Sequence, residues 1–306
     1  MRAKATLQYP SVFQYEGPFS TTFDYQKVDT YNPINNYLLA QLCGLIYQTT
    51  VQIRAQIDQW NQDTPSLKLK LVVEDIGSFR FIVVSNEAYI IVCFRGTDSF
   101  ENWLSDFNIA LEPFKNDQQQ LVHKGFYNSI LAMNDKLNAI ILKVRKNGQY
   151  IYLTGHSLGG AQAILSGFVC SQLANFTSVT TFGEPKIGNW ALTAHLNHSL
   201  NSSPPSNKSR IYRNINGMDP VPYLPIFYGL TFYLHEGLYY FFAANVGDEY
   251  RIEKTENTLV QSAVTDLPQN QYEILDWSYI HHAITDYIKN AEANKNNLVF
   301  ENLIPL

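Results

Sequence analysis

Two hydrophobic periods alternate along the chain. Apolar residues at helical spacing, such as Leu38, Leu42 and Leu45, predict helices, whereas short unbroken apolar runs predict buried strands. The predicted helices cover residues 35–47, 51–60, 121–146, 158–173 and 280–291. The predicted strands cover residues 79–84, 88–94, 150–154, 179–182, 211–215, 233–242 and 250–253.

The order of these elements predicts the fold class. The strands at 79–84 and 88–94 flank Asn86-Glu87, which suits a hairpin. Beyond residue 121, strands and helices alternate, and such alternation builds a mostly parallel sheet with helices on both faces. We therefore expect an α/β fold with a mostly parallel central sheet that helices cover on both sides.

Length favours one elaborated domain. The 306 residues would allow two domains, but α/β folds often reach about 250 residues as a single unit. Residues 1–32 are rich in Tyr, Phe and turn residues and hold no period for long. We expect them to form an N-terminal arm packed on the body, and residues 33–306 to form a single domain.

The charge of the chain argues against nucleic-acid binding, and its hydropathy argues against a membrane-spanning helix. The chain carries 22 Lys and Arg residues against 27 Asp and Glu residues, a formal net charge of −5, and its basic residues are scattered. A nucleic-acid-binding surface needs a basic stripe. No apolar run approaches the roughly 18 residues of a membrane-spanning helix. We expect neither nucleic-acid binding nor a transmembrane segment.

The first residues and the cysteines bear on the compartment. Polar residues around Pro10 interrupt the apolar segment that a signal peptide requires. The expected location is therefore cytoplasmic, with peripheral contact to membranes, while secretion after removal of a leader stays open. Cys43, Cys93 and Cys170 are distant in sequence and form neither a metal-binding pair nor a disulfide framework. We expect reduced core thiols.

The most informative stretch is Thr-Gly-His-Ser-Leu-Gly-Gly-Ala at 154–161, which places a G-x-S-x-G pattern between a predicted strand and a predicted helix. A serine on such a sharp turn exposes its hydroxyl, and the flanking glycines permit the turn. The helix N-terminus behind it favours a developing anion. Ser157 is the predicted nucleophile, and the alternative is a serine that merely caps the helix.

A nucleophilic serine needs a histidine base and a carboxylate that orients it, and with this elbow they follow in the order Ser, Asp, His. Asp219 comes just after the predicted strand at 211–215, where open α/β sheets place functional loops. His282 opens the last predicted helix and is the predicted base. Its neighbour His281 stays open as an alternative.

Other histidines fit the base less well. His156 lies inside the elbow, and His195 and His198 lie in a polar region, so we expect all three to be bystanders. His235 is the reserve base, although a structural imidazole is the simpler interpretation. His235-Glu236 lacks the second histidine of a zinc motif, so no metal is expected.

Two backbone N–H groups must hold the oxyanion of an acyl-transfer intermediate. Leu158 directly follows the nucleophile and supplies the first. The second is expected from Thr97, in the loop that follows the predicted strand at 88–94. The alternative for that loop is an ordinary turn at the end of a strand.

Together these motifs resemble the class 3 lipase family of α/β-hydrolases, which contains filamentous-fungal triacylglycerol lipases and related feruloyl esterases. The resemblance rests on Val-Cys-Phe-Arg-Gly-Thr at 92–97, Val-His-Lys-Gly-Phe at 122–126, the elbow at 154–161, Thr-Phe-Gly-Glu-Pro at 181–185 and Asp-Pro-Val-Pro at 219–222. It covers about residues 70–290. It implies an α/β-hydrolase fold, the triad Ser157, Asp219 and His282, and the oxyanion donors Thr97 and Leu158.

The resemblance also implies a short lid helix after the oxyanion loop. Residues 99–107 occupy that place, with an apolar stripe at helical spacing formed by Phe100, Trp103, Leu104 and Phe107. The alternative is that this stripe packs permanently on the core. Residues 223–242, dense in Tyr, Phe and Leu, are expected to line an acyl-chain groove or to add to the core.

The expected function is a serine hydrolase that cleaves carboxylic ester bonds of lipids, at an aggregate or membrane surface, through an acyl-enzyme and without a cofactor. An esterase for soluble aryl or acetyl esters is the first alternative. A non-catalytic interaction protein on the same fold is the second. The lipid head group, the acyl length and the oligomeric state stay open.

Overall fold

The computed structural model describes most of the chain between Tyr31 and Asn294. The described residues are 23, 31–97, 110–146, 148–173, 175–201, 210–216, 219–225, 227–243, 251–255 and 282–294, and for 227, 238–243 and 251–255 this holds for the backbone alone.

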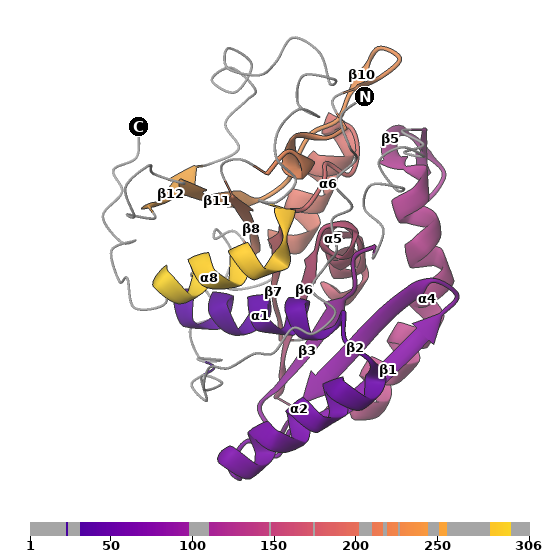
Figure 1. The fold of residues 1–306 in the computed structure, drawn as a ribbon. Helices are drawn as coiled ribbons and strands as arrows, with labels where there is room; N and C mark the ends of the chain where they lie inside the picture. Colours follow the sequence, from indigo (N-terminus) through magenta and orange to yellow (C-terminus); the bar gives the residue numbers. More distant parts are fainter. Residues whose placement is uncertain are drawn as a thin grey trace, which may run out of the picture.

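An eight-stranded sheet forms the centre of the molecule, in the order β1-β2-β3-β6-β7-β8-β11-β12 (Figure 1). Strands β3, β6, β7, β8 and β11 run parallel, and β1, β2 and β12 pair antiparallel with their neighbours. This confirms the predicted, mostly parallel sheet. The strands are β1 Lys70–Ile76, β2 Phe79–Ser85, β3 Tyr89–Phe94, β6 Tyr150–His156, β7 Phe176–Phe182, β8 Ile211–Asn216, β11 Leu238–Ala243 and β12 Arg251–Thr255.

Helices cover both faces of the sheet, as expected, and two separate apolar clusters result. On one face lie α1 (Pro33–Leu45), α2 (Thr50–Asp63) and α8 (Ile284–Asn294), with α8 packed along α1 (Figure 1). The other face carries α4 (Lys124–Val144), α5 (Leu158–Cys170) and α6 (Trp190–Asn201).

The two clusters explain why β2 and β3 contain unbroken apolar runs. Along β2, Ile82 and Val84 point into the first cluster, whereas Phe81 and Val83 point into the second. Successive strand side chains face opposite sides of a sheet, so a strand buried on both sides needs apolar residues throughout.

One predicted helix starts too early. Residues 121–123 belong to β5 (Asp117–His123), which pairs antiparallel with β4 (Leu111–Phe114). The chain turns into α4 only after His123, whose Nδ1 accepts the Phe126 N–H at 3.3 Å and caps the helix. The prediction of a helix over 121–146 was therefore wrong at its start, because the apolar pair Leu121-Val122 suits either period.

The predicted strand at 233–242 is also wrong over its first part. Backbone pairing with β8 begins at Leu238, after Gly237 with a φ of 72°. Before it lies a small hairpin of β9 (Phe227–Tyr228) and β10 (Thr231–Phe232), joined to the body by a bridge between Gly188 and Leu234. The 3₁₀ turn Val221–Tyr223 (η1) connects β8 to this hairpin.

All three cysteines are buried and free, as expected from the sequence. Cys43 and Cys93 are distant in sequence, yet their sulfur atoms lie 3.9 Å apart. Burial raises the pKa of Cys170 to about 12. These thiols therefore act as core side chains.

The described residues of the N-terminal arm lie against the body. The buried ring of Phe23 has its centroid 4.8 Å from that of Tyr89 and 4.7 Å from that of Tyr152. The Tyr31 hydroxyl donates to Asn214 Oδ1 at 3.3 Å.

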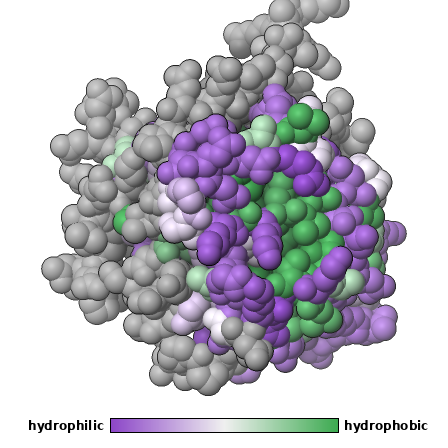
Figure 2. All heavy atoms as spheres, turned by 90° about the horizontal axis from the view of Figure 1, so that it is seen from below, coloured by the Kyte–Doolittle hydropathy of each residue, from purple (hydrophilic) through white to green (hydrophobic). Residues whose placement is uncertain are grey.

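On the end of the molecule seen from below, apolar residues gather in an area that polar residues surround (Figure 2).

Candidate active site

Ser157 lies on a strained turn between β6 and α5. Its φ of 57° and ψ of −129° fall outside the regions that residues with a side chain ordinarily adopt. Two hydrogen bonds hold this conformation, from Ser157 N–H to Phe182 O at 2.9 Å and from Gly160 N–H to Ser157 O at 2.8 Å. Strand, turn and helix thus form the geometry that the G-x-S-x-G pattern predicts.

Both glycines of the pattern are sterically required. A Cβ at Gly155 would overlap the carbonyl group of Gly159 and stand 2.7 Å from Gly160 N. A Cβ at Gly159 would overlap the Phe94 carbonyl group. The first turn of α5 can therefore cross closely over the ends of β6 and β3, which is how Ser157 reaches its place.

Asp219 and His282, separated by 63 positions in the chain, form a buried hydrogen-bonded pair. His282 Nδ1 lies 2.8 Å from Asp219 Oδ2, and the side chains are 1% and 0% exposed. Because a carboxylate accepts, Nδ1 carries the hydrogen and Nε2 of the neutral ring keeps its lone pair. That tautomer suits a general base.

Two further groups hold the Asp219 carboxylate. The Tyr287 hydroxyl donates to Oδ2 at 2.6 Å, and the Val221 N–H donates to Oδ1 at 2.8 Å. Burial, together with the adjacent carboxylate, raises the pKa of Tyr287 well above its usual value, so the phenol stays a donor. The carboxylate is thus oriented from both sides.

Gly183 makes room for this pair. Its φ is 59°, and an added Cβ would stand 2.8 Å from Asp219 Oδ2 and 3.0 Å from two ring atoms of His282. The residue after β7 must therefore lack a side chain. In the sequence, this glycine is recognisable only as part of the motif at 181–185.

The serine side of the site is closed off in this structure. Ser157 is 2% exposed, and its hydroxyl makes no hydrogen bond to any residue that the structure describes. The structure thus joins Asp219 to His282 but leaves the Ser157–His282 hydrogen bond unformed. Such bonds are often long in proteins without substrate and tighten when substrate binds.

The two expected oxyanion donors lie beside Ser157. Leu158 opens α5, so its N–H belongs to the first helical turn, where intrahelical partners are lacking. Gly96, next to Thr97, packs so closely that an added Cβ would stand 2.7 Å from His156 O and 3.2 Å from Ser157 Cβ. The Thr97 loop therefore borders the elbow.

His156, which sequence reasoning set aside as a candidate base, contacts the backbone of the proposed base. Its Nε2 lies 2.7 Å from the backbone oxygen of His282, and its Nδ1 lies 2.8 Å from the Tyr47 hydroxyl. The two imidazole rings lie 4.6 Å apart. Burial, and then the neighbouring His282, lower the pKa of His156 well below its usual value, so it stays neutral.

Sequence reasoning missed the hydrogen bonds that link Tyr47 and His156 to the backbone of His282. Nε2–H of His156 donates to the carbonyl group, so Nδ1 accepts the hydrogen of Tyr47. Tyr47 follows α1, His156 ends β6, and His282 precedes α8. No local pattern could join three such distant segments.

His235 is a structural imidazole, and the reserve role as base is not supported. Its Nε2 lies 2.5 Å from Pro222 O, so the ring donates to the loop that also carries Asp219. Burial, followed by the charges of Arg213 and Lys186, lowers the pKa of His235 well below its usual value.

One group of described side chains offers ligand atoms close enough to share a metal ion, namely Glu184, His235 and Glu236, whose atoms lie within 4.8 Å of one another. Burial raises the pKa of both carboxyl groups, and the nearby charge of Arg213 lowers it. Arg213 is itself 2% exposed. Arg213 already supplies a positive charge beside the two carboxyl groups, so we assign no cation here.

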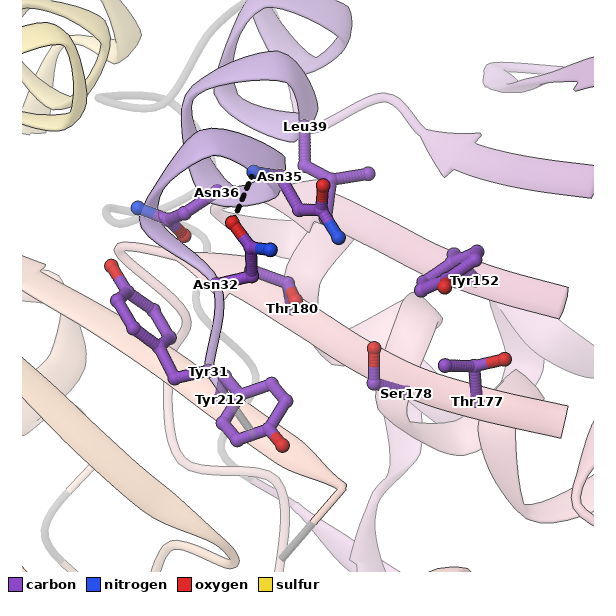
Figure 3. Close-up of a pocket in the computed structure, with 10 residues that line it drawn as sticks. All are labelled: Tyr31, Asn32, Asn35, Asn36, Leu39, Tyr152, Thr177, Ser178, Thr180 and Tyr212. Atoms are coloured by element: carbon purple, nitrogen blue, oxygen red, sulfur yellow. Dashed lines mark hydrogen bonds between the residues drawn. The ribbon is translucent and has the colours of Figure 1, made fainter. Parts of the chain in front are cut away.

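A small pocket lies between α1 and the amino-terminal halves of β7 and β8, away from Ser157 (Figure 3). Its volume of about 20 Å³ suits a single water molecule. Its lining is largely polar and comes from Tyr31, Asn32, Asn35, Asn36, Leu39, Tyr152, Thr177, Ser178, Thr180 and Tyr212. It is not a substrate site.

Two of the sequence predictions concern segments that are not described. The lid residues Phe100, Trp103, Leu104 and Phe107 fall within the gap at 98–109, and His281 falls within the gap at 256–281. Within the described ranges, no helix is long and apolar enough to cross a bilayer.

Residues 91–229 match the family model described as Lipase (class 3). A lipase from Rhizomucor miehei is 31% identical over 192 residues, which are 60% of this chain and 47% of the relative. Lipase A from Sodiomyces alcalophilus is 34% identical over 165 residues, 45% of this chain and 40% of the relative. The chain thus spans less than half the length of either relative.

Solved structures agree in fold. A structure of Rhizomucor miehei triacylglyceride lipase has a TM-score of 0.63 at 24% identity and covers 81% of this chain and 92% of its own. Another, whose authors ascribe the catalytic centre of a triacylglycerol lipase to a serine protease triad, has a TM-score of 0.61 at 25% identity with the same coverage. The predicted α/β-hydrolase fold is therefore confirmed.

The comparisons do not support the predicted cytoplasmic location. A further fold relative, with a TM-score of 0.56, is Rhizomucor miehei lipase in complex with its propeptide.

The motif resemblance itself is confirmed by the family match over 91–229 and by the fungal relatives. Over residues 91–229 the chain thus matches the class 3 lipase family, and the sequence relatives and fold relatives described above are lipases.

Proposed function

We propose that this protein is a serine hydrolase that cleaves carboxylic ester bonds of lipids through an acyl-enzyme intermediate. The observation that carries the proposal is the buried Asp219–His282 hydrogen bond of 2.8 Å, which fixes the imidazole tautomer of a base. Asp219 follows β8 and Ser157 follows β6, so both lie beyond the carboxyl ends of parallel strands. The family relatives, which are named lipases, support a lipid ester as the substrate.

Acylation begins when His282 Nε2 accepts the proton of Ser157 Oγ as the oxygen attacks the ester carbonyl carbon. The Thr97 and Leu158 N–H groups hold the oxyanion, and each is worth about 3 kcal/mol by analogy with other oxyanion holes. The imidazolium gives its proton to the departing alcohol. Asp219 stabilises the charged ring and stays ionised.

Deacylation repeats these steps with water. His282 Nε2 removes a proton from a water molecule, the hydroxide attacks the acyl carbon, and Ser157 leaves with the proton. No step requires a metal or an organic cofactor. The Tyr47 hydroxyl donates to His156, which donates to the backbone oxygen of His282, and the Tyr287 hydroxyl donates to Asp219.

Access to the serine supports action at a lipid surface. Because Ser157 is 2% exposed, an ester can reach it only if part of the cover moves. We propose that residues 99–107 form this cover and open at an aggregate, as the stripe of Phe100, Trp103, Leu104 and Phe107 predicts. Residues 33–306 form a single domain in this proposal, with residues 1–32 as its arm.

Fatty-acid release tests the proposed function. Triacylglycerol, phosphatidylcholine and galactolipid are each presented below and above their aggregation threshold to the wild type, Ser157→Ala and His282→Ala. We expect a rise in rate above the threshold for at least one lipid, and its loss in both variants. Release of acid only from a soluble ester such as p-nitrophenyl acetate would contradict a lipid substrate. Covalent labelling of Ser157 by a fluorophosphonate distinguishes a serine hydrolase from a non-catalytic protein on the same fold.

A further inference from the structure

Exposed apolar side chains concentrate on one small protrusion. Among the described residues, seven large hydrophobic side chains are exposed, and four of these lie on or beside the β9–β10 hairpin. They are Leu230 at 100% exposure, Trp190 at 68%, Phe232 at 64% and Tyr228 at 44%. Leaving this much apolar surface in water is unfavourable unless something covers it.

The hairpin is built to present its tip. Tyr228 pairs with Thr231, so Gly229 and Leu230 form a two-residue turn, and Gly229 has a φ of 61°. Glycine first in such a turn is typical of a tight type II′ hairpin. Leu230 therefore stands at the outermost point, and the hairpin projects from the end opposite α2 (Figure 1).

The base of the hairpin is tied to the proposed active site. An antiparallel bridge between Gly188 and Leu234 joins the segment after β10 to the segment just before α6, whose first residue is Trp190. On the other side, Lys186 N–H donates to Leu224 O at 2.8 Å, and Leu224 directly follows η1. The same loop carries Asp219 at its start.

The segment around the tip carries no charge. From Pro220 to His235 the sequence contains no Asp, Glu, Lys or Arg. Burial keeps the pKa of His235 well below its usual value, so this residue adds no charge near neutral pH. Tyr228, which is 44% exposed, accompanies the apolar side chains, and such an amphipathic ring favours the boundary between water and an apolar phase.

We propose that the β9–β10 hairpin docks the protein on neutral or zwitterionic lipid aggregates, with Leu230 and Phe232 inserted among the acyl chains and Trp190 and Tyr228 at the boundary. A protein interface buries about 800 Å² on each partner, which a two-stranded tip with four exposed side chains cannot supply. The lack of Lys and Arg disfavours anionic lipid as a requirement. The role in catalysis rests on the proposed function, whereas docking itself does not.

From the sequence, residues 223–242 are expected to line an acyl-chain groove or to add to the core. Part of this segment is neither core nor acyl groove in the structure, because its apolar side chains point into solvent. The hairpin follows the Asp219 loop through η1, so the docking tip and the proposed catalytic carboxylate belong to one chain segment.

Vesicle flotation with full-length Ser157→Ala, which cannot hydrolyse the lipid, tests the docking. Phosphatidylcholine vesicles are offered to this protein and to versions that add Leu230→Asp, Phe232→Ser, or both. Loss of one inserted side chain should weaken partitioning about 10- to 100-fold. Leu230→Phe should retain it. The matched control is Leu142→Asp, which alters a side chain 66% exposed on α4 and should have no effect.

Several outcomes would overturn the proposal. These are equal binding by the hairpin variants, an equal loss in Leu142→Asp, binding only when phosphatidylserine is added, or a dimer in solution that the hairpin variants dissociate. Circular dichroism and the melting temperature show that each variant is folded, and Phe232→Ser gives a second variant if Leu230→Asp fails to fold.

Activity separates docking from the proposed function. In the catalytically intact chain, Leu230→Asp should lower hydrolysis of an aggregated lipid about 10-fold or more and leave hydrolysis of a soluble short ester unchanged. If the wild type cleaves no ester but its flotation depends on the hairpin, the proposed function fails and docking stands. If it cleaves lipid equally well without Leu230 and Phe232, docking fails and the proposed function stands.

Discussion

His156 donates the hydrogen on its Nε2 to the backbone oxygen of His282 across 2.7 Å. The residue that precedes the proposed nucleophile therefore holds the backbone of the proposed base. Because the Tyr47 hydroxyl in turn donates to His156 Nδ1, the end of β6 and the segment just after α1 together hold the backbone at His282.

Removing the Tyr47 hydroxyl should slow catalysis. Tyr47→Phe deletes one hydrogen bond in a buried chain, and a net value of about 0.5–1.5 kcal/mol corresponds to a 2- to 12-fold fall in kcat. KM should change little, because Tyr47 acts through His156 and not on the substrate. Steady-state kinetics on a soluble ester measure both. Tyr31→Phe, which removes a hydrogen bond to Asn214 elsewhere, is the control, and an equal fall there would disprove the specific role.

Removing the Tyr287 hydroxyl should have a larger effect. Tyr287→Phe takes a charge-assisted hydrogen bond of 2.6 Å from Asp219, and such bonds are worth about 1.5–3 kcal/mol. We expect kcat to fall about 10- to 100-fold with the fold retained. Tyr127→Phe, which alters a hydroxyl bonded to Lys115 N–H far from the site, should leave kcat unchanged. Unchanged kcat in Tyr287→Phe would show that Asp219 needs no such support.

A methyl group at position 183 should disable the site sterically. Gly183→Ala adds a Cβ 2.8 Å from Asp219 Oδ2 and 3.0 Å from His282, so the pair must separate. Activity should fall at least 100-fold. Gly77→Ala is the matched control, because its φ of 61° imposes the same backbone strain of about 1–2 kcal/mol while nothing lies within 4 Å of the new methyl group. Equal activity in the two variants would contradict this geometry.

The buried acid pair should make stability depend on pH. Burial raises the pKa of Glu184 and Glu236 in the folded protein above the unfolded value of 4.5. The folded state then holds more protons than the unfolded state above about pH 4.5, so this contribution to stability falls as the pH rises towards the folded pKa.

Glu236→Gln replaces the protonated acid by a neutral amide and should remove that dependence. Its melting temperature relative to the wild type should rise steadily between pH 5 and pH 8. Glu112→Gln, on β4, serves as the control and should run parallel to the wild type. A constant difference between Glu236→Gln and the wild type across this range would contradict a raised pKa of Glu236.

Local patterns predicted most of the sheet and the polar residues at its edge. The two-sided burial of β2 and β3 leaves apolar runs, and the elbow needs glycines at fixed spacing, so both are visible in one sequence. The triad Ser157, Asp219, His282 was predicted because the partners of a serine elbow follow it along the chain in the order Asp, His. Residues Leu192, Leu196 and Leu200 carry the helical spacing of α6, which was not used.

What sequence reasoning missed depends on contacts between distant segments. His156 and His282 are 126 positions apart, and nothing near either residue indicates their hydrogen bond. The polar edge strand β5 carries Asp117 and three glutamines, and its two apolar residues Leu121 and Val122 fit a helix equally well. The exposed tip at Leu230 looks apolar in sequence, so only the structure separates it from the core.

Covalent labelling of the intact protein with a fluorophosphonate tests the central claim most directly. Mass spectrometry should locate a single adduct on Ser157 in the wild type and in His281→Ala, none in Ser157→Ala, and labelling slowed by about 10³-fold or more in His282→Ala. An adduct that persists in Ser157→Ala, or a wild type that is not labelled at all, would contradict the proposed serine hydrolase.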